Sequence, residues 1–475
     1  MSKYEIDRLL KQGCEQYPDH PYIFEREGDA FVPRTFSQFA GDVYAAAAAL
    51  LGKGLAEQNI ILYAANSYAY TVTDIAVMGY VGVSCTLSKE WKLPDVCRAA
   101  EILHAAAVVY DAAREETVSA LRRQHPELLY LRIEDMLHLP ACSQALTPRS
   151  TTAHCKIIFS SGTTGSPKAV MLSQHAMFAN WDSLHLRTPF TIDDRDYLFL
   201  PLSHTYSGVC NFLYSLCNGM QIYLCSDTKK ITEELQMVRP TVFCAVPLIY
   251  ERIHAACTAN GISPNAALGG CIRYLFCGGA YFRPELRKFY KDAGLNMLEA
   301  YGLTETSSII SVEYTEPDDF ESVGTVMESL EVRIADPDET GTGEILVRGD
   351  NLFSGYYANS EATAAAFDAD GFFRTGDLGS LDGRKLWLKG RKRRMILLSN
   401  GENIYPDEIE AKFAGYPQLS KIKVFAENGQ LCAVLYASAD CDGDRITEAV
   451  NAQLPGYAKI RKTEVIRDSI DTRLK

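Results

Sequence analysis

The sequence lacks the cysteine patterns of the common metal-binding modules. Its fourteen cysteines are scattered singly through 475 residues, with no Cys-x-x-Cys pair and no grouping with histidine at zinc spacing. A zinc module built on such pairs is therefore excluded. Isolated cysteines in a long chain indicate buried, reduced thiols, so we expect a cytoplasmic protein.

Long apolar segments and an excess of positive charge are missing too. The first seven residues contain no apolar signal core, and the longest nearly apolar run, residues 75–87, is shorter than the roughly 20 residues of a membrane-spanning helix. Its composition predicts a core helix that runs into a strand. The formal net charge of −13 disfavours nucleic acid and anionic membranes as partners. We expect a soluble protein with no transmembrane segment.

The chain is long enough for two to four structural units with a large core. Strand-like and helix-like segments alternate over the first 300 or so residues, which indicates parallel sheets with crossover helices. Expected helices are 4–17, 36–52, 68–80 and one from about Gln174; expected strands are 22–24, 60–63, 106–110, 156–160, 197–200, 221–224, 242–246, 274–277 and 296–300.

Beyond about residue 325 the pattern changes to short strands with turns, expected at 331–334, 344–348 and 386–389. The predicted fold class is therefore α/β. A large N-terminal domain, residues 1–390, has parallel βαβ sheets packed by helices plus a small β-rich subdomain. A hinge at 391–394 leads to a small mobile C-terminal α+β domain, 395–475, which we expect to be incomplete.

Residues 160–168, Ser-Ser-Gly-Thr-Thr-Gly-Ser-Pro-Lys, combine hydroxyls, flexible backbone and one cation. Such a loop offers many donors to a polyphosphate and no bulky side chains, and the lysine adds a charge for phosphate oxygens. A Walker-type P-loop is excluded, because the glycines are three apart and proline precedes the lysine. Candidate phosphate-binding residues are Ser160, Ser161, Gly162, Thr163, Thr164, Gly165 and Lys168.

This loop resembles the signature of the adenylate-forming superfamily, which includes acyl-CoA synthetases, luciferases and the adenylation domains of peptide synthetases. Within this superfamily, the sequence is most similar in style to bacterial fatty acyl-CoA ligases. The resemblance implies that the loop grips the β- and γ-phosphates of ATP. It also implies acid activation with ATP and Mg²⁺.

Residues 301–306, Tyr-Gly-Leu-Thr-Glu-Thr, resemble the second signature of that family. Thr304 offers a hydroxyl to a phosphate, and the carboxylate of Glu305 suits Mg²⁺, a hard cation. Taken alone, Glu305 could equally be a solvated turn carboxylate. The resemblance implies that Tyr301 lies against adenine, with small residues that admit the base at Gly278, Gly279, Ala280 and Gly302.

Asp377, in Thr-Gly-Asp, resembles the ribose ligand of the family, and Arg391 resembles its second ribose contact. An aspartate can accept hydrogen bonds from both ribose hydroxyls. On its own the first motif would be only a turn, and the basic run 389–394 only a solvated face. The resemblance places the pivot of the interdomain hinge at Arg393, where relatives often carry Asp or Lys.

His204, in Leu-Pro-Leu-Ser-His-Thr-Tyr, occupies the position at which the family places a ring near the substrate carboxylate. A lone histidine is more often structural, so both interpretations stay open. The resemblance implies an acyl pocket with walls at Tyr206, Ser207, Asn211, Gly279 and Ile310. Leu248 and Ser207 replace the Arg and Glu of many long-chain enzymes, which weakens a long-chain assignment.

Residues 399–406 resemble the C-terminal loop of CoA ligases, in which Gly401 would let a pantetheine arm pass. The favoured function is activation of a carboxylic acid to an acyl-adenylate, followed by transfer to CoA. In the family the C-terminal domain rotates between these steps. The alternatives are a stand-alone enzyme that loads an acyl carrier protein, and a non-catalytic binder of ATP or acyl-adenylate.

Most family members end in a segment whose last lysine contacts the substrate carboxylate and the α-phosphate. Alignment of Thr472 with the family threonine puts this lysine one position beyond Lys475. Three alternatives remain: a truncated sequence, a one-residue shift that lets Lys475 serve, or an absent lysine. We expect adenylation to depend on it more than thioester formation does.

Overall fold

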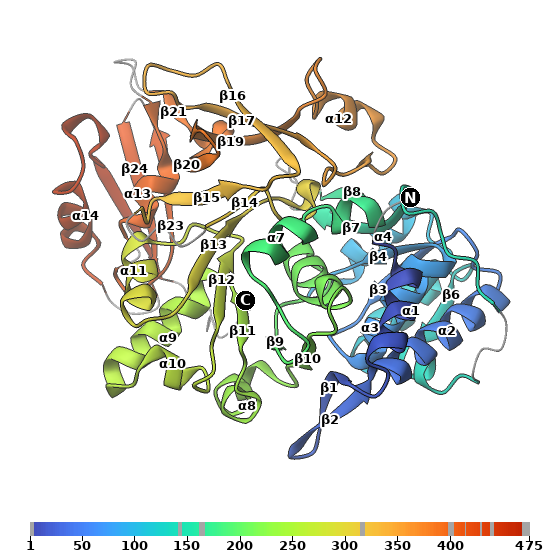
Figure 1. Cartoon of the computed structure of the whole chain (residues 1–475). Coiled ribbons are helices and arrows are strands. Elements are labelled where there is room, and N and C mark those ends of the chain that lie inside the picture. The colour runs from blue at the N-terminus through green and yellow to red at the C-terminus, as the bar shows by residue number, and fades with distance from the viewer. Residues whose placement is uncertain are drawn as a thin grey trace. The chain divides into compact units, whose positions relative to one another are not determined.

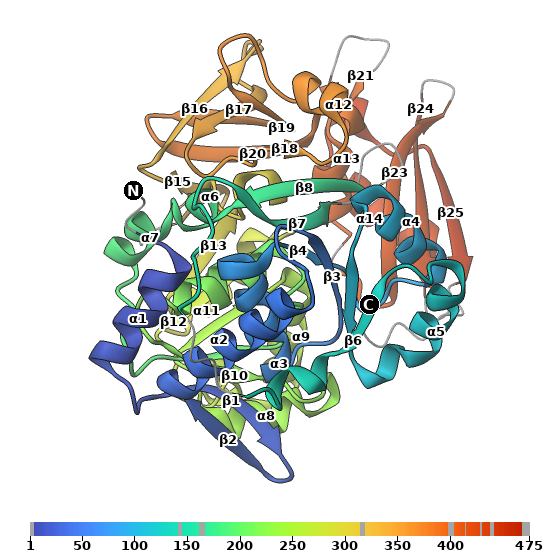
Figure 2. The same ribbon diagram turned by 90° about the vertical axis from the view of Figure 1, so that its right-hand side faces the viewer.

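The computed structural model describes residues 4–140, 145–160, 167–313, 319–397, 403–413, 415–427, 430–437 and 441–467. The chain forms two compact units (Figures 1 and 2). The first comprises Met1–Glu331 and Arg348–Phe373, and the second Val332–Val347 and Arg374–Lys475. The predicted hinge segment, 391–394, lies within the second unit. The domain bounds 1–390 and 395–475 and the hinge role stay predictions.

A mostly parallel sheet forms one half of the first unit. Its strand order is β15-β14-β13-β12-β11-β9-β10-β1-β2, and only β2, β14 and β15 pair antiparallel with their neighbours. The strands are β1 (Pro21–Glu27), β2 (Ala30–Thr35), β9 (Arg195–Leu198), β10 (Gln221–Leu224), β11 (Val242–Ala245), β12 (Tyr274–Gly278), β13 (Met297–Tyr301), β14 (Ser311–Val312) and β15 (Ser322–Val326).

Helices cover this sheet and bury an aromatic core. Figure 1 shows α9 (Pro247–Asn260), α10 (Pro264–Ala267) and α11 (Pro284–Asp292) beside β11–β13, with α8 (Ile231–Val238) near β9 and β10. Tyr197, Phe243, Tyr250 and Tyr290 are fully buried between these layers. The predicted βαβ arrangement is confirmed here.

The second sheet of the first unit has the order β18-β8-β7-β4-β3-β5-β6, with antiparallel pairing only at β7–β8 and β8–β18. Figure 2 shows β7 and β8 side by side. The strands are β3 (Asn59–Tyr63), β4 (Val83–Thr86), β5 (Ala107–Tyr110), β6 (Leu129–Arg132), β7 (His154–Ser160), β8 (Lys168–Ser173) and β18 (Gly355–Tyr356). The remaining helices of the first unit are α1 (Ile6–Gln16), α2 (Phe36–Gly52), α3 (Tyr68–Ala76), α4 (Leu93–Leu103), α5 (Glu115–Gln124), α6 (Gln174–Phe178), α7 (Trp181–Arg187) and α12 (Ser360–Ala365).

Local sequence explains two of these elements. Thr35 and Gln38 form a reciprocal capping box that starts α2 at the predicted residue. The apolar run 75–87 divides into the end of α3, a short π-helix, Val77–Val81, and strand β4. In the described part of the chain, no helix is long and apolar enough to cross a membrane.

The second unit is an α+β assembly. Its first sheet has the order β16-β17-β19-β20, and a three-stranded sheet, β23-β24-β25, packs on α13 and α14 around Phe413 and Leu435. The elements are β16 (Leu330–Ala335), β17 (Gly343–Gly349), β19 (Phe373–Asp382), β20 (Lys385–Arg391), β21 (Ile396–Leu397), β22 (Asn403–Ile404), α13 (Pro406–Ala411), β23 (Leu419–Glu427), β24 (Gln430–Ala437), α14 (Gly443–Asn451) and β25 (Lys462–Arg467).

A fully buried ion pair joins β7 to α3 in the first unit. The ammonium of Lys156 lies 2.6 Å from one oxygen of Asp74, and the hydroxyl of Ser84 donates to the other oxygen at 2.5 Å. Both charged side chains are at most 1% exposed. A buried charge is tolerated only when its partner and its hydrogen bonds are present. The pair therefore fixes the strand that leads to Ser160.

The substitution K156M should leave the Asp74 carboxylate buried without its counter-charge. We expect it to lower the free energy of unfolding by about 3–5 kcal/mol, measured by urea denaturation. The control K288M removes an exposed partner of Asp292 and should change stability by less than about 1 kcal/mol. Equal effects of the two substitutions would contradict the assigned role.

Candidate active site

The predicted phosphate loop lies at the tip of a β-hairpin. Ser160 ends β7, Lys168 begins β8, and the two residues face each other across the antiparallel pair. The helix predicted from about Gln174 is confirmed as α6, which the Ser173 hydroxyl caps, and a strand that was not predicted, β8, lies between the loop and this helix. Ser161, Gly162, Thr163, Thr164 and Gly165 lie outside the described residues.

The carboxylate of Glu305 lies beside this hairpin. It belongs to a short 3₁₀ helix, Thr304–Thr306, which follows the end of β13. Its Oε1 accepts hydrogen bonds from the Tyr356 hydroxyl at 3.0 Å and, weakly, from the Ser160 hydroxyl at 3.4 Å. The ammonium of Lys168 lies 4.4 Å from the centre of the Tyr356 ring. A hydroxyl, a cation and a carboxylate from distant segments are thus brought together.

Tyr356 is a site residue that the sequence did not reveal. Burial and the Glu305 carboxylate raise the pKa of its phenol well above the usual range, so the hydroxyl stays protonated and donates. Its partner lies 51 positions away in the chain. A tyrosine on a short strand carries no local signal for such a contact.

A tight turn presents Thr304 and Glu305. A β-carbon at Gly302 would lie 1.9 Å from the carbonyl oxygen of Ser308, so only glycine fits this close approach. Ser307 and Ser308 have positive φ angles of 48° and 91°. The turn is closed by a hydrogen bond from the Ser308 amide to Leu303 O at 3.0 Å. Thr304 is half-buried.

The residues predicted to surround adenine lie at the ends of two adjacent strands. Gly278, at the end of β12, pairs with Ala300 on β13, directly before the buried Tyr301. A β-carbon at Gly278 would be 2.9 Å from the Ala300 carbonyl oxygen. Gly279 has a φ of +83°, and it and Ala280 are exposed. At these strand ends, a base would therefore meet backbone and small side chains.

His204 lies before a π-helix, Tyr206–Leu213. Its Nδ1 accepts the backbone N–H of Tyr206 at 3.2 Å, which leaves the proton on Nε2. The ring is accessible to solvent, yet the surrounding protein desolvates it and lowers its pKa, so the imidazole is neutral near pH 7. A neutral Nε2–H can donate to a carboxylate oxygen.

Four of the five predicted acyl-pocket residues are buried, all except Gly279, and three of the four are hydrogen-bonded. Tyr206 donates to Phe276 O at 2.9 Å, Ser207 donates to Leu200 O at 2.9 Å, and Asn211 donates to the buried Asp196 at 2.7 Å. Ile310 is fully buried. These contacts fix the side chains in place, and their role as pocket walls stays a prediction.

Asp377 and Arg391 face each other on β19 and β20 of the second unit. They are direct cross-strand partners, with Arg391 Nε 2.9 Å from Asp377 Oδ1. The Asp377 amide donates to the Thr375 hydroxyl, and Gly376 between them has a φ of +71°. The structure therefore brings the two predicted ribose ligands together.

The predicted pivot, Arg393, lies within the basic run 389–394. Arg393 belongs to a short 3₁₀ helix, Lys392–Arg394, within the second unit. The basic run around it is paired rather than free: Lys389 with Glu408, Lys392 with Glu344, and Arg394 with Asp407 and Glu410. Gly401 and Lys475 lie outside the described residues.

The donor set fits a magnesium ion only in combination with a phosphate ligand. In the described ranges, no group of three or more acidic, histidine or cysteine side chains could hold a metal. Mg²⁺ commonly binds through one or two carboxylates, substrate phosphates and water. Glu305, next to Ser160 and Lys168, provides such a single carboxylate.

Comparison with known proteins decides the family. A family model described as AMP-binding enzyme matches residues 10–357. The chain belongs to the AMP-binding enzyme family. The long-chain-fatty-acid–CoA ligase FadD15 of Mycobacterium bovis is 28% identical over 496 residues, covering 89% of this chain and 80% of that protein. A feruloyl-CoA synthase of an Amycolatopsis species is 29% identical over 334 residues, covering 67% of each.

Solved structures share the fold. ATP-bound MatB from Rhodopseudomonas palustris has a TM-score of 0.84 at 23% identity, covering 98% of this chain and 95% of that one. O-succinylbenzoate coenzyme A synthetase from Bacillus subtilis, with ATP and magnesium ion, has a TM-score of 0.83 at 21% identity, covering 96% and 95%. The predicted family and α/β fold class are confirmed for this AMP-binding enzyme.

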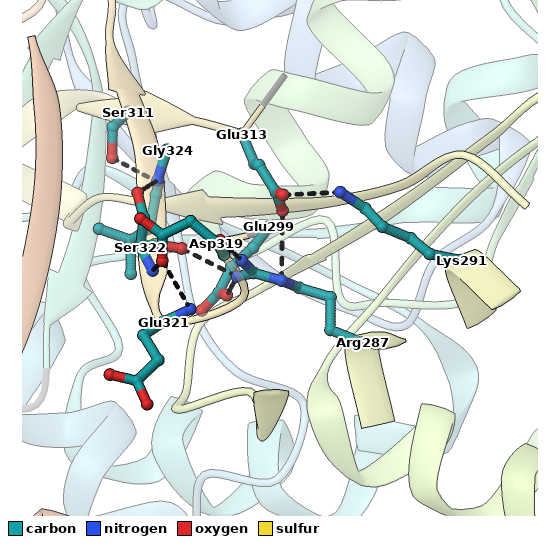
Figure 3. Close-up of polar contacts among 10 residues, drawn as sticks. Arg287, Lys291, Glu299, Ser311, Glu313, Asp319, Glu321, Ser322 and Gly324 are labelled. Carbon is teal, nitrogen blue, oxygen red and sulfur yellow. Dashed lines mark hydrogen bonds and ion pairs between the residues drawn. The ribbon is translucent and has the colours of Figure 1, made fainter. Parts of the chain in front are cut away.

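A buried charge cluster supports the strand that carries the Tyr301–Glu305 turn (Figure 3). Arg287 of α11 is fully buried between Glu299 on β13 and Glu313, and donates to Ser322 O at 2.9 Å and Asp319 O at 2.8 Å. Lys291 lies 2.7 Å from Glu313. Burial raises the pKa of Glu299 to about 7, against the opposing effect of Arg287.

This raised pKa predicts a pH dependence of stability. The folded state favours the protonated carboxyl, so its contribution is complete below pH 4.5 and is lost as the pH rises through about 7. When the pH is raised from 5 to 7.5, the free energy of unfolding of the wild type should fall by roughly 2 kcal/mol more than that of E299Q. Denaturation curves at each pH measure the difference. E321Q, at an exposed carboxylate nearby, should follow the wild type. Parallel profiles for E299Q and wild type would refute the assignment.

Proposed function

We propose that this protein uses ATP to activate a carboxylic acid as an acyl-adenylate and then transfers the acyl group to CoA. The observation that carries the proposal is the convergence of Ser160, Lys168 and Glu305 at the β7–β8 hairpin. A hydroxyl and an ammonium suit phosphate oxygens, and the carboxylate suits the cation that accompanies them. Relatives named as CoA ligases support the assignment.

In the first step, a carboxylate oxygen of the acid attacks the α-phosphorus of ATP, and pyrophosphate leaves. Lys168 and Ser160 hold phosphate oxygens of the leaving group, and Thr304 offers a further hydroxyl. Mg²⁺ bound at Glu305 would neutralise negative charge on the phosphates. Neutral His204 donates its Nε2–H to the acid and orients it. Catalysis by this set rests on positioning and charge neutralisation.

Asp377 and Arg391 are the proposed ribose ligands. Their mutual ion pair joins the two side chains across β19 and β20. The carboxylate can accept from the ribose hydroxyls while the guanidinium donates to them. Tyr301, Gly302 and the backbone at 278–280 are the proposed adenine contacts. Because the ion pair exists beforehand, little side-chain entropy is lost when the sugar binds.

In the second step, a thiol attacks the carbonyl carbon, gives up its proton, and AMP leaves. CoA and an acyl carrier protein present the same pantetheine arm, and CoA is the proposed acceptor because the relatives are named for it. The predicted roles of Gly401 in the thiol tunnel and of Arg393 as a pivot belong to this step. We place the reaction in the cytoplasm, because all thirteen cysteines in the described ranges are free thiols.

Removal of the Glu305 charge should impair adenylation. We expect E305Q to lower carboxylate-dependent ATP–pyrophosphate exchange by about 10²–10³-fold, because the amide cannot replace an anionic oxygen at the cation. E361Q, at an exposed position on α12, is the matched control and should retain full exchange. Unchanged exchange in E305Q would show that the metal assignment is wrong.

The acceptor and the acid can be determined in one set of assays. Acids from acetate through ferulate to long-chain fatty acids are supplied with ATP, Mg²⁺ and either CoA or a phosphopantetheinylated carrier protein. We expect AMP formation with one class of acid and faster thioester formation on CoA. Faster transfer to the carrier protein would assign the loading function. Absence of AMP with every acid would favour the non-catalytic binder.

A further inference from the structure

Tyr356 contacts both charged groups of the proposed phosphate site. Its hydroxyl donates to Glu305 Oε1 at 3.0 Å, and its ring lies 4.4 Å from the ammonium of Lys168. Tyr356 is only 6% exposed. Tyr356 therefore contacts a carboxylate through its hydroxyl and a cation through the face of its ring.

The backbone around Tyr356 is fixed to the same two segments. On β18, Tyr356 pairs with Val170 of β8, two residues beyond Lys168. The amide of Phe353 donates to the backbone oxygen of Glu305 at 2.8 Å. Gly355 has a φ of +132°, and a β-carbon there would lie 2.8 Å from Thr363, which leaves no room for a larger residue. Backbone hydrogen bonds to β8 and to Glu305 therefore fix the position of the Tyr356 ring.

The Tyr356 side chain contacts two groups of opposite charge, the Glu305 carboxylate and the Lys168 ammonium. Lys168 and Glu305 share Tyr356 as a neighbour, yet no ion pair joins them directly in the described structure. A direct pair would aim the Glu305 carboxylate and the Lys168 ammonium at each other instead of at the metal and the phosphates. The neutral hydroxyl stabilises the carboxylate and the ring face stabilises the ammonium, and both charges remain able to bind a ligand. Both hydrogen bonds to the Glu305 carboxylate in the described residues go to Oε1.

We propose that Tyr356 is a positioning residue that holds the Glu305 carboxylate for the metal and the Lys168 ammonium for the phosphates. The proposal rests on the proposed function, because it assigns a purpose to both groups. It predicts that the hydroxyl and the ring act separately. The hydroxyl governs metal-dependent binding of the nucleotide, and the ring governs binding of the nucleotide with or without metal.

Three variants separate these effects. Y356F keeps the ring under Lys168 and removes only the bond to Glu305, whereas Y356L removes both. Y357F is the matched control, because the neighbouring tyrosine hydroxyl accepts a hydrogen bond from Asn59 at 2.9 Å instead. Binding of α,β-methylene-ATP, which cannot react at the α-phosphorus, is measured by calorimetry at graded Mg²⁺ concentrations and in EDTA. Denaturant midpoints check that each variant is folded.

For Y356F we expect the Mg²⁺ concentration at half-maximal nucleotide binding to rise about tenfold, with an affinity in EDTA close to that of the wild type. Y356L should bind the nucleotide roughly fivefold more weakly in EDTA, because the ring is lost, and should also show the Mg²⁺ shift of Y356F, because the hydroxyl is lost too. Y357F should match the wild type. A folded Y356F with unchanged Mg²⁺ dependence, or with equal losses with and without Mg²⁺, would overturn the proposal.

Failure of the underlying function gives a different result. If the wild type binds the analogue but Y356F is indistinguishable from it, only the positioning role fails. If the wild type does not bind the analogue with Mg²⁺, the proposed ATP chemistry fails, and the role of Tyr356 fails with it.

Discussion

Strands β7 and β8 pair so that Ser160 and Lys168 face each other across the hairpin, and the proposed nucleotide chemistry depends on this constraint. Cross-strand pairing fixes the two ends of the phosphate loop relative to each other. The same strand, β8, pairs with β18 and so determines where Tyr356 and, through it, the Glu305 carboxylate lie.

Buried ion pairs hold this arrangement in place at two points. Lys156 and Asp74 join β7 to α3 below the hairpin, and Arg287 joins α11 to β13 below the turn at Glu305. Each pair lies where a strand enters the proposed site. Buried charges stabilise little by themselves, but they penalise any displacement that separates them. Such pairs therefore help β7 and β13, the strands that lead into the proposed site, to keep their register.

Much of the fold could be predicted because its signals are local. The capping box at Thr35 starts α2, and short apolar runs between turns give β10 and β12. Strand β8 was not predicted; its pairing partners, β7 and β18, include a segment almost 190 residues away in the chain. Asp377 and Arg391 were identified through family resemblance, but their cross-strand ion pair emerges from the register of β19 and β20. Tyr356 and Arg287 could not be found, because their partners are distant in sequence.

The central claim, that the acid is activated as an adenylate, is tested most directly by the fate of an oxygen label. The protein is given an acid with ¹⁸O in both carboxylate oxygens, together with ATP, Mg²⁺ and CoA, and the products are analysed by mass spectrometry. An oxygen that attacks the α-phosphorus stays with the nucleotide when the thiol takes the acyl group. The account therefore predicts one ¹⁸O atom in each AMP. Unlabelled AMP, or label in inorganic phosphate with ADP as product, would contradict it.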